Sequence, residues 1–371
     1  MAAEALRSSV SDSHKRVEAA IAAFAKGEIV VVMDDDDREN EGDLFVAASL
    51  CTPEKMAFII RHTSGIVCAP LAADEARRLH LDPMVAHNDA PLGTAFTVTV
   101  DVRHGLTTGI SAEERTNTVR ALANGNMGAA DFVRPGHVFP LVAREGGVLM
   151  RSGHTEACID LCRLAKVPPV GVLSELMNED GTVMRGPAVA AFAKKHKLVE
   201  LSIADLIAYR QARDKLVDRV GEFAMPSEIG PLRGYAYVTP FDQVQHFAFV
   251  YGDIGNGRDV LARLHRADVI GDVFGGARPL QAALARFKKE GRGVIVYLRD
   301  GSAGVPVNPL PQGDSGTEAA RSRQWREVGL GAQILKDLGI SSIRLLASSQ
   351  RTYVGLGGFG IEISATESID T

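Results

Sequence analysis

The feature of this sequence that most constrains its fold is a dense acidic run at the end of a hydrophobic strand. The β-branched residues 29–32 lead almost at once into residues 34–43, of which seven are Asp or Glu. Carboxylates held this close raise each other's pKa unless a cation lies among them. Oxygen ligands suit a hard divalent ion such as magnesium. The run therefore indicates either a cation site or, as the alternative, a solvated acidic loop with an N-cap.

Helix-poor residues favour an extended or looped conformation for this run. Asn40 and Gly42 are both unfavourable in a helix interior. Side chains alternate between two faces in an extended chain. We therefore expect Glu39, Glu41 and Asp43 to share one face.

Length and composition are those of a globular chain with ample core material. The chain has 371 residues, 46% of them hydrophobic and 23% charged, and length alone suggests roughly two domains. The net charge of −5 gives no general attraction to nucleic acid or anionic membranes. No apolar run approaches the roughly 18 residues of a membrane span, and residues 1–16 lack the apolar core of a secretory signal. We expect a cytoplasmic protein with no nucleic-acid partner and no membrane partner.

The cysteines support a reducing compartment, because they lack the dense spacing of a disulfide framework. All four lie in the first half of the chain: Cys51, Cys68, Cys158 and Cys162.

Alternating strand and helix patterns in the first half predict an α/β or α+β domain. A helical pattern ends at Gly27, and Thr52-Pro53 opens a helix that reaches about Arg61. Residues 96–102 alternate as a strand, and Ser111 begins a capping box that starts another helix.

The second half predicts another α/β unit behind a polar connector. We expect an N-terminal domain at residues 1–205, a linker at 206–222 and a C-terminal domain at 223–371. The patterns predict strands at residues 247–251, 293–298 and 342–347, helices at 280–289 and 318–338, and a long loop at 300–317.

A histidine between two prolines is a second candidate functional group. His137 follows Pro135 and precedes Pro140 in a stretch that cannot be a regular helix, so we expect its imidazole on a stiff turn. Such rigidity suits catalysis, while a purely structural role is the alternative.

The segment from Arg151 to Glu156 directly precedes an amphipathic helical pattern. Amides at a helix start, an arginine fork and the hydroxyl of Thr155 together predict a phosphate-binding cradle. His154 lies at the mouth of this helix. With Glu39 it would form the mixed nitrogen and oxygen set of a catalytic divalent site.

Two further patterns near this helix allow more than one interpretation. His154, Cys158 and Cys162 have the spacing i, i+4, i+8, but cysteines on an apolar helix face usually behave as small buried residues, so we do not expect a zinc site there. Glu175 follows a strand-like segment, where it is either a helix cap or a general base.

Taken together, these segments resemble 3,4-dihydroxy-2-butanone 4-phosphate synthase over roughly residues 10–205. That family makes a riboflavin precursor and formate from ribulose 5-phosphate, with magnesium or manganese, in a homodimer. The matching segments are 37–43, 62–68, 93–98, 107–111, the His137 stretch, 151–156 and Glu175.

The resemblance implies a role for each matching residue. Glu39 and His154 correspond to metal ligands, and His137 and Glu175 to the groups that transfer protons. The residues that correspond to the substrate-binding set are Arg38, Glu39, Asp43, Arg151, Ser152, Gly153, His154, Thr155 and Glu175. Residues 86–92 depart from the family pattern, so we assign no role to them.

Residues from about 223 to 364 resemble GTP cyclohydrolase II, whose chemistry is missing here. That family binds zinc with three cysteines, whereas no cysteine follows Cys162 and Asp268 stands at the first ligand position. Residues 278–281 and 300–304 replace two further functional stretches. We expect no zinc and a non-catalytic scaffold or regulatory module. The alternatives for this domain are a binding module for a nucleotide or regulator and a remnant. For the whole protein they are a bifunctional enzyme that also hydrolyses GTP and a non-catalytic interaction protein.

Overall fold

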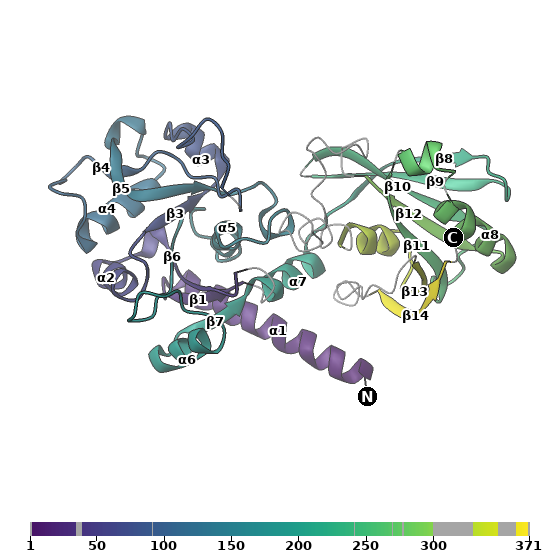
Figure 1. The fold of residues 1–371 in the computed structure, drawn as a ribbon, viewed down its shortest axis with the longest axis horizontal. Coiled ribbons are helices and arrows are strands. Elements are labelled where there is room, and N and C mark those ends of the chain that lie inside the picture. Colours follow the sequence, from purple (N-terminus) through teal and green to yellow (C-terminus); the bar gives the residue numbers. More distant parts are fainter. Residues whose placement is uncertain are drawn as a thin grey trace. The chain divides into compact units, whose positions relative to one another are not determined.

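The computed structural model describes residues 2–34, 39–90, 92–240, 242–268, 270–276, 278–299, 329–347 and 361–369. The chain divides into two compact units, Met1–Tyr209 and Arg210–Thr371 (Figure 1). The described part of each unit contains one seven-stranded sheet with helices packed against it. The predicted mixed α/β architecture is therefore confirmed in both halves. No described helix combines the length and the apolar character needed to cross a bilayer.

Unit 1 contains a mixed sheet with the strand order β4-β5-β3-β6-β2-β1-β7. The β1/β7 and β3/β5 pairs are parallel, and the other pairs are antiparallel. Its strands are β1 (Val30–Met33), β2 (Gly42–Ala47), β3 (Cys68–Leu71), β4 (Val100–Val102), β5 (Phe132–Val142), β6 (Gly171–Glu175) and β7 (Val199–Ser202). Its main helices are α1 (Ala2–Ala25), α2 (Pro53–His62), α3 (Ala73–Arg78), α4 (Ala112–Leu122), α5 (His154–Leu164), α6 (Pro187–His196) and α7 (Ile203–Arg213).

Local signals fixed the helix ends of unit 1 as predicted. Gly27 has a φ of 74°, the left-handed conformation that glycine adopts readily after a helix. The Thr52 hydroxyl accepts the Lys55 amide at the start of α2. Ser111 forms a complete capping box at the start of α4.

Two predictions around His137 are wrong. His137 lies inside strand β5 and not on a turn, because β5 is paired on both sides: Val138 lies opposite β4 and Phe139 opposite β3. The strand predicted over residues 96–102 shortens to β4, Val100–Val102. Residues 96 and 97 form only isolated bridges.

The pairing register places Asp43 and Glu175 side by side in the sheet. Asp43 of β2 lies opposite Glu175 of β6. Cys68 of β3 lies opposite Leu173 of β6 and Phe139 of β5. Strand β3 therefore separates β6, which ends at Glu175, from β5, which carries His137.

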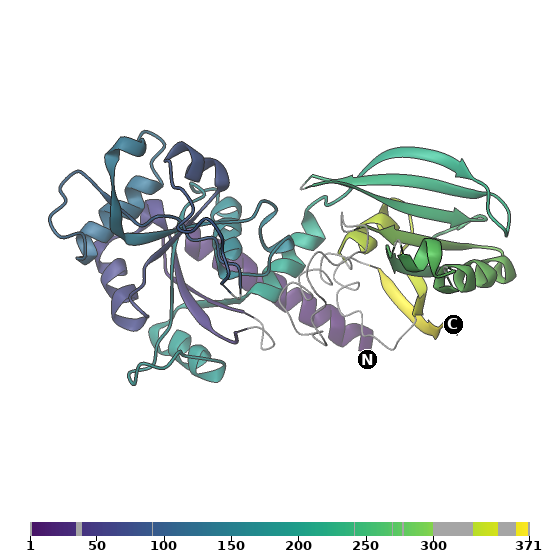
Figure 2. The same cartoon turned by 45° about the horizontal axis from the view of Figure 1, so that its top comes forward.

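Unit 2 contains a second mixed sheet with the strand order β14-β13-β11-β12-β10-β9-β8. Figure 2 shows β8, β9 and β10 as a long antiparallel ribbon. Its strands are β8 (Asp218–Met225), β9 (Leu232–Thr239), β10 (Asp242–Tyr251), β11 (Val260–Arg266), β12 (Gly293–Leu298), β13 (Ser342–Ala347) and β14 (Glu362–Ser368). The π-helix η4 (Ile270–Phe274) follows β11, and α8 (Arg278–Glu290) packs on β11 and β12.

Sequence patterns found only part of this second sheet. The predicted strands at 247–251, 293–298 and 342–347 and the helix at 280–289 are confirmed by β10, β12, β13 and α8. Residues 329–337 are helical, while the rest of the predicted 318–338 helix and the 300–317 loop lie outside the described residues. Strands β8 and β14 escaped prediction because most of their side chains are exposed and show no apolar alternation.

We predict that Gly136→Ala destabilises unit 1 by about 1–3 kcal/mol, because an added methyl group would meet the β4 backbone at Val100 and Asp101. Thermal unfolding followed by circular dichroism measures the change. Gly125→Ala is the matched control, since nothing lies within 4 Å of its Cβ position. Equal melting temperatures for the two variants would contradict the close approach of β4 and β5.

Candidate active site

Carboxylates from three neighbouring strands meet at one edge of the unit 1 sheet. Asp34 follows β1, Asp43 lies in β2 and Glu175 ends β6. Asp43 is only 2% exposed, and its Oδ1 atom has no hydrogen-bond partner within the described part of the chain. A buried carboxylate without a partner is costly unless something positive approaches it.

The surroundings of Asp43 disfavour the charged form of its carboxyl group. Burial raises the pKa of the Asp43 carboxyl well above its usual value, and the negative charges of Glu175, Glu39, Asp34 and Glu41 raise it further. A divalent ion at this point would reverse the sign of the local field.

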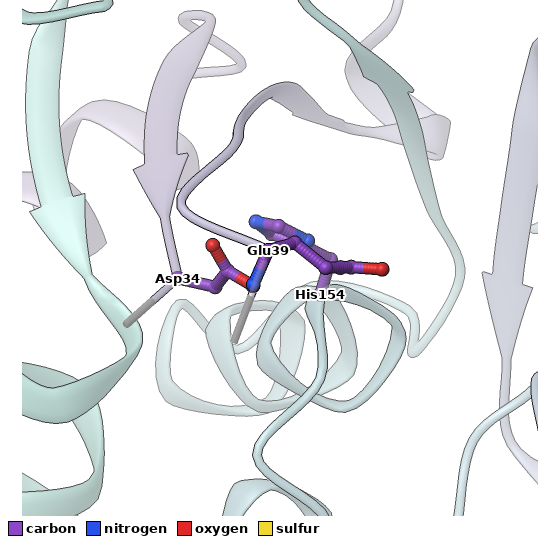
Figure 3. Close-up of side chains that lie close together, drawn as sticks. All are labelled: Asp34, Glu39 and His154. Atoms are coloured by element: carbon purple, nitrogen blue, oxygen red, sulfur yellow. The ribbon is translucent and has the colours of Figure 1, made fainter. Parts of the chain in front are cut away.

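Three side chains beside Asp43 have the geometry of a metal site. Asp34, Glu39 and His154 each offer a ligand atom, and these atoms lie within 4.8 Å of one another (Figure 3). The predicted pairing of Glu39 with His154, more than one hundred residues apart, is thus spatially possible. This is the one cluster of three or more potential metal ligands among the described residues.

Asp34 is a member of this cluster that the sequence did not single out. Its carboxylate accepts the amides of Glu39 at 3.1 Å and Glu41 at 2.9 Å, which fixes the turn that carries Glu39. The only available signal was its place as the first acid after β1. Arg38, a predicted substrate contact, lies outside the described residues.

The acidic run is not the single extended face that we expected. Asn40 has a φ of 55°, so the alternation is interrupted between Glu39 and Glu41. Glu41 forms an ion pair with Arg185 at 2.6 Å, whereas Glu39 joins the cluster with Asp34.

Hydrogen bonding orients the imidazole of His154. Its Nε2 atom lies 3.2 Å from the carbonyl oxygen of Val32. Because a carbonyl only accepts, Nε2 carries the proton and Nδ1 presents its lone pair. Nδ1 lies 3.8 Å from Asp43 Oδ2. This arrangement is typical of a histidine held ready for a metal.

The start of α5 is built around a buried ion pair. Arg151 donates to Glu156 at 2.7 Å and to the carbonyl oxygen of Leu92 at 3.1 Å. Gly153 is required between them, because a Cβ atom there would meet the guanidinium of Arg151. Ser152, His154 and Thr155 are also buried. Arg151 therefore links the helix start to Leu92, the last residue of the 86–92 segment that departs from the family pattern.

Glu175 is held by the turn that follows α2. Ser64 donates its hydroxyl to Glu175 Oε2 at 2.8 Å, and its backbone amide to the Glu175 carbonyl oxygen at 2.9 Å. Glu175 therefore belongs to a strand end with a fixed carboxylate, and it is not a helix cap.

His137 forms a dyad with Asp101, another residue that sequence reasoning missed. Asp101 Oδ2 lies 2.7 Å from His137 Nδ1, and Oδ1 accepts the His137 amide at 2.9 Å. Nδ1 then carries the proton, so Nε2 is the basic nitrogen. Gly109, with a φ of 83°, lies against both side chains and leaves no room for a Cβ atom. Asp101 was hidden because β4 appeared only as part of a longer alternating strand.

The cysteines behave as small core residues, as predicted. Cys158 and Cys162 are fully buried in α5, and burial raises the pKa of the Cys158 thiol. Neither belongs to the cluster formed by Asp34, Glu39 and His154.

In unit 2, polar side chains around η4, β11 and β12 bind one another. Asp272 contacts His265 Nε2 at 2.9 Å and accepts the Tyr297 hydroxyl at 2.7 Å. The Asp268 amide also donates to Asp272, and the Asp268 carboxylate accepts the Gly271 amide. These polar groups therefore have partners within the protein.

Family models match both units. The model of 3,4-dihydroxy-2-butanone 4-phosphate synthase matches residues 18–209, and that of GTP cyclohydrolase II matches residues 218–369. The riboflavin biosynthesis protein RibBA of Salinispora arenicola is 48% identical over 94% of this chain and 87% of its own length. The bifunctional riboflavin biosynthesis protein RIBA 1 of Arabidopsis thaliana is 46% identical, over 93% and 67% respectively.

Solved structures give the same two-part match. A two-domain 3,4-dihydroxy-2-butanone 4-phosphate synthase from A. baumannii, RibBX, aligns with a TM-score of 0.79 and 35% identity, covering 96% of this chain and 99% of that one. A 3,4-dihydroxy-2-butanone 4-phosphate synthase in complex with two magnesium ions aligns with a TM-score of 0.52 and 45% identity, covering 53% and 97%.

We predict that Asp43→Asn raises the melting temperature of the metal-free protein at neutral pH, since it removes a buried carboxylate surrounded by like charges. Each kcal/mol of unfolding free energy regained raises the melting temperature by roughly 2–4 °C. The same substitution should shrink the additional stabilisation by magnesium chloride. Differential scanning fluorimetry in chelator and in magnesium measures both effects.

Asp74→Asn is the control, because its side chain is 85% exposed. A lower melting temperature of metal-free Asp43→Asn, together with an unchanged magnesium response, would contradict a cation site at Asp43.

Proposed function

The chain belongs to the 3,4-dihydroxy-2-butanone 4-phosphate synthase family and is a lyase of riboflavin biosynthesis, and we propose that it converts D-ribulose 5-phosphate to L-3,4-dihydroxy-2-butanone 4-phosphate and formate at the Asp43 edge of unit 1. The observation that carries this proposal is the buried Asp43 carboxylate, whose Oδ1 atom has no hydrogen-bond partner among the described residues, beside the Asp34, Glu39 and His154 cluster. We assign the synthase domain to residues 1–205, the linker to 206–222 and the cyclohydrolase-like domain to 223–371.

We propose that Glu39 and His154 hold magnesium or manganese, with Asp34 beside them. The donor set of carboxylates and one imidazole fits a hard divalent ion. When bound, such an ion stabilises the negative charge that develops on sugar oxygens when a proton leaves the carbon beside the ketone. The relative in complex with two magnesium ions supports this choice.

The start of α5 is the proposed site for the substrate phosphate. Its first amides point along the helix axis, where the macrodipole favours an anion. In this proposal Ser152 and Thr155 supply hydroxyl groups, and Gly153 allows the backbone to approach the phosphate closely. Arg151 supplies a positive charge that Glu156 already balances in part. Arg38 and Asp43 complete the proposed substrate-binding set with Glu39, His154 and Glu175.

His137 and Glu175 are the proposed proton-transfer groups. They lie on strands β5 and β6, which β3 separates, and Asp43 lies beside Glu175. The reaction needs several proton transfers, for which an imidazole and a carboxylate are suited. Hydrogen bonds of His137 with Asp101 and of Glu175 with Ser64 keep both groups in fixed orientations.

A homodimer is also part of the proposal, since the family resemblance implies it. Unit 1 exposes large apolar side chains on its loops, a composition common at subunit contacts. These are Ile66, Met84, Val85 and Ile110. The cytoplasmic location expected from the sequence remains a prediction.

For the C-terminal domain we propose a non-catalytic scaffold or regulatory role. No cysteine is present beyond Cys162, Asp268 stands at the first zinc-ligand position that the resemblance implies, and residues 278–281 replace the stretch that carries the other two ligands. A catalytic zinc needs about three protein ligands. Relatives that match both domains carry two kinds of name. One is named as a two-domain synthase, and others are named as bifunctional proteins. A bifunctional enzyme that hydrolyses GTP and a nucleotide-binding module are the alternatives.

We predict that His137→Ala and Glu175→Ala each lower formate release from ribulose 5-phosphate by about 10²-fold or more, because each removes a proton-transfer group. Substrate binding should remain measurable by calorimetry, and chelator should abolish turnover of the parent protein. His104→Ala and Glu179→Ala, which alter exposed residues, are the controls. Near-normal formate release by either active-site variant would contradict the proton-transfer role proposed for the substituted residue.

We predict that the purified protein contains well under one zinc per chain and does not turn over GTP, since the thiolate ligands are missing. Elemental analysis measures the zinc content, and a GTP hydrolysis assay measures turnover. Stoichiometric zinc with GTP turnover would establish the bifunctional alternative. Saturable heat on titration with GTP, without turnover, would favour the nucleotide-binding alternative.

A further inference from the structure

A buried arginine on α4 has no role in the site as described so far. Arg115 is 5% exposed, and its Nη1 donates to the carbonyl oxygen of Gly65 at 2.9 Å. Its Nε has no hydrogen-bond partner within the described part of the chain. An unsatisfied buried donor costs about 1–3 kcal/mol. Core stability alone therefore gives a weak reason for an arginine at this position.

The Gly65 carbonyl belongs to the turn that holds Glu175. Gly65 has a φ of 75°, and its amide donates to the Thr63 hydroxyl. One residue earlier, Ser64 binds both the carboxylate and the backbone of Glu175. By fixing the Gly65 peptide, Arg115 fixes where the Ser64 hydroxyl points, and so which way the Glu175 carboxylate faces.

We propose that Arg115 is a positioning residue for Glu175: its hydrogen bond to the Gly65 carbonyl oxygen orients the Glu175 carboxylate through Ser64. This inference rests on the proposed role of Glu175. Arg115 does not touch the substrate. Its loss should therefore lower kcat and leave the KM for ribulose 5-phosphate nearly unchanged.

The test compares Arg115→Met and Arg115→Lys in the full-length protein with magnesium present. We expect kcat for formate release to fall by about 10²-fold in Arg115→Met, the size of effect that misplaced catalytic groups produce. KM and the magnesium-induced thermal shift should change less than threefold. Arg115→Lys keeps the charge and one donor for Gly65, so its kcat should stay within about tenfold of the parent. Arg120→Met, an exposed arginine on the same helix, is the matched control.

A double-mutant cycle separates positioning from general loss of stability. If Arg115 acts through Ser64, then adding Arg115→Met to a Ser64→Ala background should lower kcat less than threefold further. A full additional loss would overturn the proposal, as would an Arg115→Met protein with near-parental kcat. Should Arg115→Met fail to fold, Arg115→Lys decides: a fall in its kcat of more than about tenfold overturns the inference.

These results are distinguishable from failure of the proposed function. If His137→Ala and Glu175→Ala remain active, the proton-transfer assignment fails whatever Arg115 does. If both lose activity while Arg115→Met keeps it, only the positioning role is wrong.

Discussion

The site depends on one electrostatic constraint: several carboxylates share a small, poorly solvated space at the ends of β1, β2 and β6. Asp43 is buried opposite Glu175, and the turn after β1 brings Asp34 and Glu39 to the same place. Such a cluster is unfavourable by itself, because like charges repel and water cannot reach Asp43. The fold tolerates it through strand pairing and a large apolar core, and a divalent ion bound there would relieve the repulsion.

Much of this arrangement could be predicted from short stretches of sequence. The Thr52 and Ser111 caps, the glycine at 27 and the buried strands are encoded within a few residues, so local rules suffice. Long-range partners were harder. The placement of His137 on a strand, and its bond to Asp101, depend on how β5 pairs with β4, which no local pattern records. Glu39 and His154 were paired from their ligand chemistry, and the family resemblance implied the same pair. Asp34 and Arg115 were not singled out because their contacts depend on the three-dimensional fold.

The two units differ in what their frameworks retain. Unit 1 leaves a buried carboxylate oxygen without a partner among the described residues, as a ligand site does. In unit 2 the residues of the corresponding functional region bind each other: His265, Tyr297 and the Asp268 amide all converge on Asp272. A carboxylate thus joins β11, η4 and β12 by hydrogen bonds, and the sheet persists without the soft metal ligands of the family that it resembles.

The hairpin of β1 and β2 makes the length of its acidic tip a fixed quantity. Asp34 accepts amides from both Glu39 and Glu41, and its own amide donates to the Glu41 carbonyl oxygen. A slip of β2 against β1 by one residue would turn Asp43 to the opposite face of the sheet. Surface loops usually accept insertions and deletions in evolution. Here variation should be confined to substitutions, so homologous genes ought to carry in-frame gaps almost anywhere but at this tip.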